Sequence, residues 1–363
     1  MPKSPSSDGR GSKPEKGRAR RSSPRPHLPA SRKNRTHPES TAASEPLSPA
    51  GLRSPLPAFA RHETFHPRHG WVKKGFDAAS KDPNVFARDN APLVLGVGKN
   101  MVRSIRYWCT ALKVLEPSTR LPDEGGLGPT VLGMRLLDDH RGYDPYLEDP
   151  GSLWLLHWNL LQPPCLASAW YYAFNVYPQL DFTIDDLVAS MSDWVDREFR
   201  QSRVVVGSLR KDASCIARMY GDVPTVGEVS EESIHCPFAE LGLLRALPAQ
   251  SRAYSFALGA KPGLSSKLVT SASLQFAATV AGSARSVSVS RLLRSPGSPG
   301  MVFKLSESAL YDALEREAVD DSRLRLSDTA GALQFSFTDE PGRLALEFLE
   351  GHFKNRHRMK ARA

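Results

Sequence analysis

Three histidines, a carboxylate and a guanidinium lie within the eight residues HETFHPRH, which begin at His62. Imidazole and carboxylate groups at this density can transfer protons or bind a metal ion. His62, Glu63 and His66 also match the string H-E-x-x-H, whose two imidazoles bind zinc when the motif lies within a helix. Pro67 follows directly and disfavours helical geometry at His66. We therefore expect no metalloprotease, and we interpret the segment as a cluster that orients phosphate or caps adjacent helices.

A second group of ionisable residues lies in the segment DDHRGYDPYLEDPG. Carboxylates can hold Mg²⁺ or Mn²⁺ beside a reacting phosphate, and the candidate ligands here are Asp138, Asp139 and Asp144. The alternative is a solvated loop in which Asp149 and Pro150 start the next helix. We favour the loop because the acidic residues lack the spacing of a nuclease motif. The sequence does not determine which metal ion, if any, the protein binds.

The clearest helical periodicity lies in GVGKNMVRSIRYWCTALKVLE, residues 96–116. At about 100° per residue, this segment has an apolar arc opposite a cationic arc. The apolar arc holds Met101, Ile105, Trp108, Leu112 and Leu115, and the cationic arc holds Lys99, Arg103, Arg106 and Lys113. We predict an amphipathic helix that packs one face into a core and presents the other to phosphate. A merely solvated basic face is the alternative.

Neighbouring residues extend this basic surface. Residues 71–80 are expected to form a short helix with Lys73 and Lys74 at its surface. Asn100 or the Gly96–Gly98 turn can begin the longer helix, and a glycine turn at a helix N-terminus can hold a phosphate. The predicted DNA-binding residues are Lys73, Lys74, Lys99, Asn100, Arg103, Arg106 and Lys113.

Two helices are followed by short β segments. The spacing of Thr130, Gly133 and Leu136 after the basic helix is typical of the end of a winged-helix unit, in which a recognition helix precedes a hairpin. Near the C-terminus an acidic helix precedes two strands, RLRLS and ALQFSF, and its charge suits a protein partner. We therefore predict a mainly α fold with small β hairpins: an N-terminal winged-helix-like domain, a helical middle and a second winged-helix-like C-terminal unit.

Charge and composition limit the classes of protein to which this chain can belong. The net charge is +9, and residues 1–54 contribute +8 of it, with 12 lysines and arginines against four acidic residues. This segment is rich in Pro, Ser and Arg, so we predict a disordered basic arm, which either adds salt-sensitive DNA affinity or plays no part. Four isolated cysteines predict reduced core thiols. Without a membrane-span run or a secretory signal, we expect a cytoplasmic, nucleoid-associated protein with no membrane partner.

The composition shifts divide the chain into five parts. These are a disordered basic arm (1–57), a winged-helix-like DNA-binding domain (58–140), a helical middle region (141–235), a helical and winged-helix-like C-terminal domain (236–340), and a helix with a basic tail (341–363). In the middle region His157 lies within an apolar helical stripe and is expected to be a satisfied interhelical residue. Thr183 and Asp186 have the spacing of an N-cap pair, within a helical segment expected from Phe182 to Phe199.

Several long segments together resemble the family called domain of unknown function 4007. They are HETFHPRHGWVKKGF, LGVGKNMVRSIRYW, LEDPGSLWLLHW, SPGMVFKLSESAL and LRLSDTAGALQF, and the resemblance covers roughly residues 58–340. Members of this family are encoded in bacterial anti-phage gene clusters, beside a sulfurtransferase-like ATP pyrophosphatase and a cysteine desulfurase. The best described members resemble the DNA-nicking component of phosphorothioate modification. The resemblance thus implies a protein directed at double-stranded DNA, with those two enzymes as partners.

Two functions stay open at this point. In the first, the protein nicks duplex DNA for sulfur insertion, with His62, Glu63 and Arg68 as the candidate catalytic residues. In the second, it is a non-catalytic winged-helix module that recruits the modification enzymes or regulates transcription. The lack of a recognisable nuclease motif favours the second function, and the family resemblance favours the first. We predict a DNA-binding component of a phosphorothioation-type defence system, with metal-dependent nicking as its candidate activity.

Overall fold

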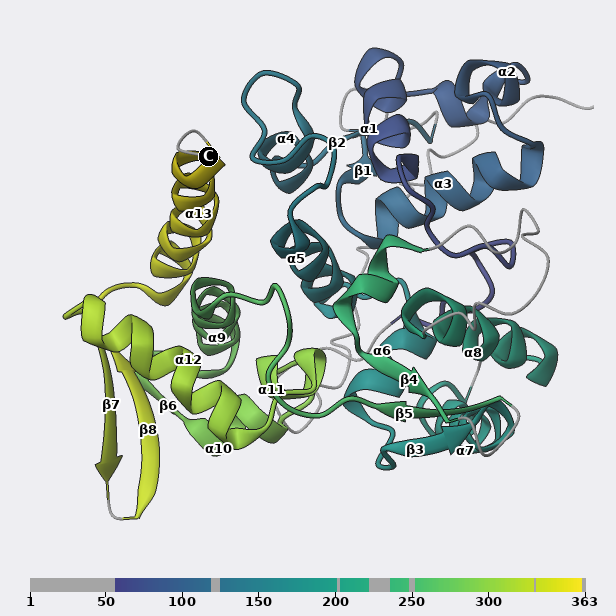
Figure 1. The fold of residues 1–363 in the computed structure, drawn as a ribbon. Helices are drawn as coiled ribbons and strands as arrows, with labels where there is room; N and C mark the ends of the chain where they lie inside the picture. The colour runs from purple at the N-terminus through teal and green to yellow at the C-terminus, as the bar shows by residue number, and fades with distance from the viewer. Residues whose placement is uncertain are drawn as a thin grey trace, which may run out of the picture. The chain divides into compact units, whose positions relative to one another are not determined.

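Helices dominate the computed structural model of this chain (Figure 1). It describes residues 56–118, 125–200, 203–221, 236–247, 252–329 and 331–360. The predicted basic arm lies outside the described residues, apart from positions 56 and 57. The prediction of a mainly α fold with small β hairpins is confirmed. No helix of the described residues is long and apolar enough to cross a membrane.

The N-terminal part of the fold places three helices before a hairpin. The helices are α1 (Trp71–Lys81), α2 (Ala91–Leu95) and α3 (Lys99–Ala111), with a 3-10 turn, η1 (Val85–Ala87), between the first two. Strands β1 (Leu115–Pro117) and β2 (Leu127–Pro129) then pair antiparallel, and α4 (Val131–Leu137) follows. Gly133 of α4 packs against the chain before β1, since a Cβ there would lie 2.2 Å from the carbonyl oxygen of Val114. The predicted helices at 71–80 and 96–116 are confirmed, although the second ends earlier, at Ala111.

The middle of the chain builds a three-stranded sheet against helices. After α5 (Pro150–Leu161) and α6 (Ser168–Asn175) come β3 (Asp181–Thr183), α7 (Ile184–Glu198) and α8 (Val206–Tyr220). A 3-10 turn, η4 (Pro237–Leu241), then leads to strands β4 (Leu244–Ala246) and β5 (Ala253–Phe256). The expected helical start at Phe182 is wrong, because Phe182 pairs with Tyr254 in the sheet and α7 begins two residues later. The predicted N-cap pair is confirmed as a capping box between Thr183 and Asp186.

The C-terminal part repeats this arrangement. Helix α9 (Ser266–Val280) is followed by β6 (Ser286–Ser288), α10 (Val289–Arg294), α11 (Pro299–Phe303) and α12 (Glu307–Asp320). Strands β7 (Leu324–Thr329) and β8 (Ala332–Phe337) form the hairpin, and α13 (Pro341–Lys360) packs on α9. The strand order is β6-β8-β7, and in the middle sheet it is β3-β5-β4. In both sheets the last strand is central and pairs antiparallel with its neighbours. We call residues 168–256 the middle unit and residues 266–337 the C-terminal unit.

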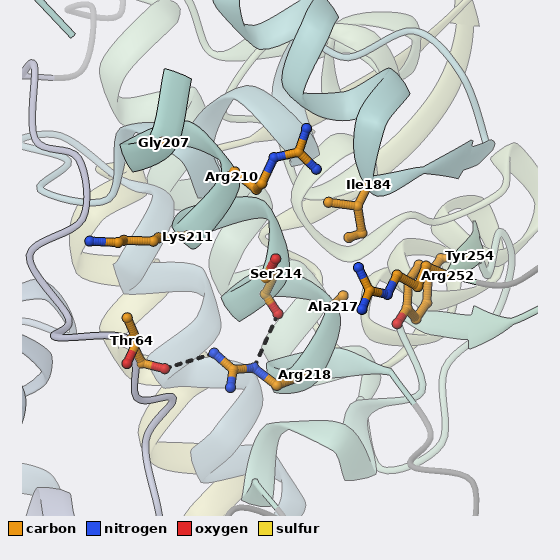
Figure 2. A pocket seen from close by; sticks show the side chains of 10 residues that line it. All are labelled: Thr64, Ile184, Gly207, Arg210, Lys211, Ser214, Ala217, Arg218, Arg252 and Tyr254. Carbon is orange, nitrogen blue, oxygen red and sulfur yellow. Dashed lines mark hydrogen bonds between the residues drawn. The ribbon is translucent and has the colours of Figure 1, made fainter. Parts of the chain in front are cut away.

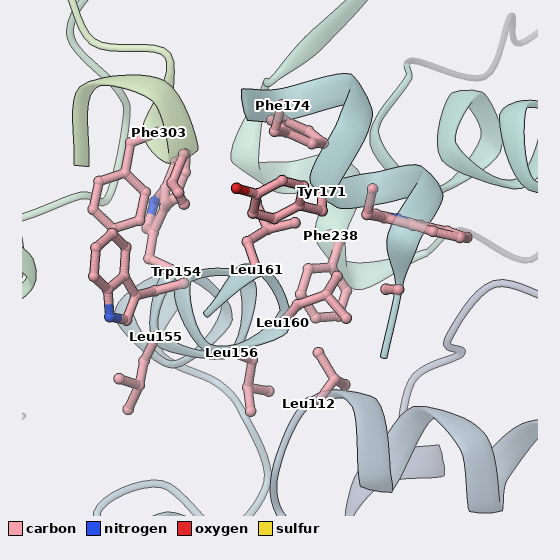
Figure 3. Packing of buried hydrophobic residues seen from close by; sticks show 14 of the residues in the cluster. Leu112, Trp154, Leu155, Leu156, Leu160, Leu161, Tyr171, Phe174, Phe238 and Phe303 are labelled. Atoms are coloured by element: carbon pink, nitrogen blue, oxygen red, sulfur yellow. The ribbon is translucent and has the colours of Figure 1, made fainter. Parts of the chain in front are cut away.

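A continuous hydrophobic core runs through the described residues, and α5 lies at its centre (Figure 3). Asp149 caps α5 by accepting from the amide of Gly151, and nearly all side chains of the helix are buried. His157 of α5 is satisfied between elements, as predicted: Nδ1 lies 2.8 Å from the Tyr220 hydroxyl and Nε2 lies 2.9 Å from the carbonyl oxygen of Val302. Burial lowers the pKa of His157 to about 4. The four cysteines are buried free thiols, which confirms their expected role in the core.

Candidate nucleic-acid interface

Helix α3 separates its two faces as the sequence predicts. Ile105 and Trp108 are fully buried, and the Trp108 indole Nε1 donates to the carbonyl oxygen of Phe65 at 2.9 Å. The opposite face exposes four of the predicted DNA-binding residues, Lys99, Asn100, Arg103 and Arg106. Because the buried face packs into the core, this cationic face is directed toward solvent.

The other predicted DNA-binding lysines use their amino groups within the fold. Lys73 is 8% exposed, and its Nζ contacts Asp77 at 2.5 Å and Asp139 at 2.8 Å. Lys113 lies beyond the end of α3, where its Nζ donates to the carbonyl oxygens of Gln162 and Pro163 at 2.5 and 2.9 Å. Burial lowers the pKa of Lys113 to about 8. Lys74 is exposed, although its Nζ donates to the carbonyl oxygen of Leu95 at 3.0 Å. The solvent-facing part of the predicted surface is therefore centred on α3.

His62 holds the loop of residues 60–64 to α8. Its imidazole is fully buried, and Nε2 lies 2.7 Å from an Asp212 carboxylate oxygen. The amide of Ala60 donates to both oxygens of the same carboxylate at 3.0 Å. Burial raises the pKa of Asp212, while its hydrogen bond to His62 acts in the opposite direction. With its imidazole enclosed, His62 positions the loop in this conformation.

The loop itself has an unusual backbone. Ala60, Glu63 and Thr64 have φ angles of 52°, 49° and 67°, in the left-handed region that residues other than glycine rarely adopt. Ser104 of α3 holds the loop from the other side, donating from Oγ to the carbonyl oxygen of His62 at 3.0 Å. Strained backbone of this kind persists only where surrounding contacts enforce it, and it is common at functional sites.

The remaining candidate catalytic residues have separate surroundings. A Glu63 carboxylate oxygen lies 3.7 Å from the Arg103 guanidinium, and the Glu63 side chain is 36% exposed. The Arg68 guanidinium lies over the rings of Phe65 and Trp71, at 5.5 and 5.3 Å from their centroids. Of the three predicted residues, Glu63 therefore offers the accessible carboxylate beside the α3 arginines, while His62 faces the interior. The catalytic assignment stays a prediction.

Helix α8 carries a second set of exposed cations that the sequence reasoning did not assign to the site. Arg210, Lys211 and Arg218 are exposed, and the Arg218 guanidinium donates to the carbonyl oxygen of Thr64 at 2.7 Å. Their positions i, i+1 and i+8, opposite the buried Asp212 and Ile216, are a helical pattern that could have revealed them. Loop 60–64 thus contacts both the basic face of α3 and the basic face of α8.

Residues 59–353 match the family described as protein of unknown function DUF4007. The chain belongs to this family. Two solved structures, an SspB crystal structure and a magnesium ion-bound SspB crystal structure, share its fold. Each is 36% identical to this chain, with a TM-score of 0.75, and the match covers 83% of this chain and 89% of the SspB chain. No curated protein matches the chain.

The DUF4007 chain uses its predicted metal-binding carboxylates elsewhere. Asp138 accepts from the amides of His140 and Arg141, and these bonds lower its pKa. Asp139 pairs with Lys73, while Asp144 accepts from two backbone amides and from the hydroxyl of Ser152 at 2.6 Å. Within the described ranges, no group of three or more His, Cys, Asp or Glu side chains could hold a metal ion. The three carboxylates do not fit a Mg²⁺ site in this arrangement. Asp138 and Asp144 brace the turns around α4 and α5, and Asp139 forms an ion pair with α1.

Proposed function

We propose that this protein is a DNA-binding component of a bacterial phosphorothioation system and that α3 contacts the backbone phosphates of duplex DNA. The observation that carries the proposal is the exposed cationic face of α3, where Lys99, Arg103 and Arg106 follow one another at helical spacing. Lysine and arginine that neutralise phosphates release counterions, which supplies most of the sequence-independent affinity for DNA. The similarity to SspB at 36% identity supports the link to phosphorothioation.

The elements around α3 support this proposal. Helix α2, a three-residue turn and α3 precede the β1-β2 hairpin, which is the order of a helix-turn-helix followed by a wing. In a winged-helix domain the helix before the hairpin enters the major groove and the hairpin lies along the backbone. On this assignment Asn100, near the start of α3, is placed to reach base edges, while the arginines contact phosphate.

Metal-dependent nicking is the second candidate function, and the magnesium ion-bound SspB structure favours it. Glu63 is the chain's own candidate for that chemistry, because its carboxylate is partly exposed beside Arg103. The alternative is a recruiter that binds DNA without cutting it. Its partners would be the sulfurtransferase-like ATP pyrophosphatase and the cysteine desulfurase.

The test combines binding and cleavage in one set of variants. The purified protein is incubated with supercoiled plasmid and Mg²⁺ or Mn²⁺, and its affinity for a labelled duplex is measured by fluorescence anisotropy. Arg103→Ala/Arg106→Ala should weaken duplex binding roughly 10-fold or more at moderate salt and lower the salt slope by about two. A matched control, Arg316→Gln/Arg325→Gln, removes two exposed arginines from the C-terminal unit and should bind like the wild type.

Each outcome separates the functions. Nicking by the wild type that Glu63→Gln abolishes, with duplex binding retained, establishes the nickase. Salt-dependent binding without nicking establishes the recruiter. Equal binding by the α3 variant and the wild type would disprove the proposed DNA contact.

A further inference from the structure

A pocket lined with cations lies on the exposed face of α8 (Figure 2). We propose that this pocket is a second phosphate-binding site, which holds the backbone of the same duplex that α3 contacts. The inference rests on the proposed function and extends it to a part of the chain where the sequence predicted only a helical region.

The pocket is an open cavity of about 560 Å³. It lies between α8 and the residues that begin α7 and β5, and Thr64 closes one side. Arg210, Lys211 and Arg218 line it from α8, and Arg252 lines it from the residue before β5; the Arg218 guanidinium points toward Thr64 (Figure 2). The hydroxyl groups of Ser214 and Tyr254 add hydrogen-bond donors. Guanidinium, ammonium and hydroxyl donors in one concave site are the groups that bind phosphate oxygens.

The balance of charge in this pocket points to an anion. Four lining residues are cationic, and none of the described lining residues is acidic. One ion pair reduces this charge: Arg210 lies 2.5 Å from Asp185, whose side chain is 76% exposed. An exposed pair of this kind contributes little free energy, so a phosphate can compete for the guanidinium. Arg218 also holds the wall of the pocket, donating to the carbonyl oxygens of Thr64 and Ser214 at 2.7 and 3.3 Å.

The pocket is joined to the α3 surface through loop 60–64. Arg103 of α3 lies near Glu63, and Arg218 of α8 donates to Thr64, the next residue in the chain. The buried pair of His62 and Asp212 fixes this loop to α8, and the bond from Ser104 fixes it to α3. The two cationic surfaces therefore meet at neighbouring residues of one braced loop, which suits a single extended polyanion.

The topology of the middle unit gives α8 the position of a recognition helix. A strand, two helices and a hairpin follow one another as β3, α7, α8 and β4-β5, and the pocket lies between the second helix and the hairpin. In winged-helix domains these two elements flank the DNA backbone. The same reasoning that assigns α3 to DNA therefore assigns α8 to the same ligand class.

The experiment removes charge from the pocket without disturbing its wall. Lys211→Gln keeps a helix-forming side chain, and Arg252→Asn suits the left-handed φ of 59° at that position. The double variant is compared with the wild type, with Arg103→Ala/Arg106→Ala and with the control Arg316→Gln/Arg325→Gln, after thermal melting has shown that each is folded. We expect Lys211→Gln/Arg252→Asn to bind duplex DNA about 10-fold more weakly, with a salt slope lower by about two.

Three results would overturn the inference. Wild-type affinity and salt slope in the pocket variant, with loss of binding in the α3 variant, would leave the proposed function standing and remove the second site. Adenosine monophosphate that binds the wild type but not the pocket variant, with duplex binding unchanged, would make the pocket a nucleotide site. A wild type that does not bind duplex DNA would overturn the proposed function as well.

Discussion

The middle unit and the C-terminal unit share a topology and differ in the charge of one helix. Both place a strand before helices and a hairpin, and both make the last strand central in a three-stranded sheet. Helix α8 exposes Arg210, Lys211 and Arg218, whereas the equivalent helix α12 exposes Glu307, Asp312 and Glu315. The two units therefore share a topology but not a ligand-determining surface: under the proposed function, the charge of α8 favours a polyanion, whereas the charge of α12 favours a basic or neutral partner.

The buried faces of the two helices share a second feature. Each helix has one carboxylate that points inward and binds a residue of another segment. Asp212 of α8 meets His62, and Glu317 of α12 accepts from Lys267 at 2.7 Å and from the hydroxyl of Ser266. The two pairs differ in burial: the side chains of His62 and Asp212 are each 1% exposed, whereas Lys267 is 28% exposed. Charge burial is thus more complete on the side that holds the candidate DNA-binding loop.

Breaking the buried pairs should give the largest effects. Asp212→Ala leaves His62 and the amide of Ala60 without their partner in the interior, and we expect a loss of about 3–5 kcal/mol in the free energy of unfolding. Glu317→Ala should cost less, about 1–3 kcal/mol, because Lys267 can turn to solvent. Urea unfolding followed by circular dichroism measures both. Equal losses would show that the difference in burial has no energetic consequence.

Reversing the surface charges tests the comparison of the two helices directly. Arg210→Glu/Lys211→Glu on α8 should weaken duplex binding by roughly 100-fold, about 2.7 kcal/mol, because two attractive contacts become repulsive. The opposite change on α12, Asp312→Lys/Glu315→Lys, alters the net charge by the same amount and should leave specific binding within about threefold at physiological salt, where the Debye length is about 8 Å. If the duplex affinity of both variants changes in proportion to the net charge of the protein, the proposed binding site on α8 is contradicted.

A buried cation of the C-terminal unit contacts the middle unit. Lys304, after α11, donates to the carbonyl oxygen of Phe174 at 2.8 Å and lies 4.5 Å from the centroid of the Phe256 ring. Burial, with a smaller effect of Lys261, lowers its pKa to about 7. Lys304→Met should therefore raise the free energy of unfolding by about 2 kcal/mol at pH 7.

The pH dependence of this effect has a definite sign. Above pH 7 the unfolded state binds more protons at Lys304 than the folded state does, so wild-type stability rises toward the unfolded pKa. Between pH 7 and 8 the wild type should gain up to about 1 kcal/mol relative to Lys304→Met. The buried thiols have raised pKa values, and their contribution to the pH dependence of stability is the same in both proteins. It is therefore absent from the difference between the wild type and Lys304→Met. A difference that does not change with pH would contradict a neutralised Lys304.

Helix caps should give the smallest effects. Thr183→Ala removes a reciprocal capping box from α7, whereas Ser306→Ala removes a single cap from α12. We expect losses of about 1–2 and 0.5–1 kcal/mol in the free energy of unfolding. Urea unfolding, with equal m-values for the two variants, measures which loss is larger. A larger loss at Ser306 would indicate that α12 depends on its start more than α7 does.

Local sequence patterns determined much of the fold. The amphipathic pattern of residues 96–116, the Thr183–Asp186 pair and the alternation in RLRLS and ALQFSF each predict an element that the structure contains. These signals act between residues close in the chain, where helical and strand periodicity set which side chains share a face. For the same reason the exposed positions of Lys99, Arg103 and Arg106 on α3 could be predicted.

Only the tertiary structure decided which charged groups remain available. Lys73, Lys113 and His62 are residue types that often bind ligands. In the fold, however, their side-chain nitrogens bind Asp139, the carbonyl oxygen of Gln162 and Asp212, respectively. The α8 pocket likewise gathers residues from the start of the described chain to β5, so no local pattern reports it. Contacts between distant segments depend on packing and burial, which periodicity does not encode.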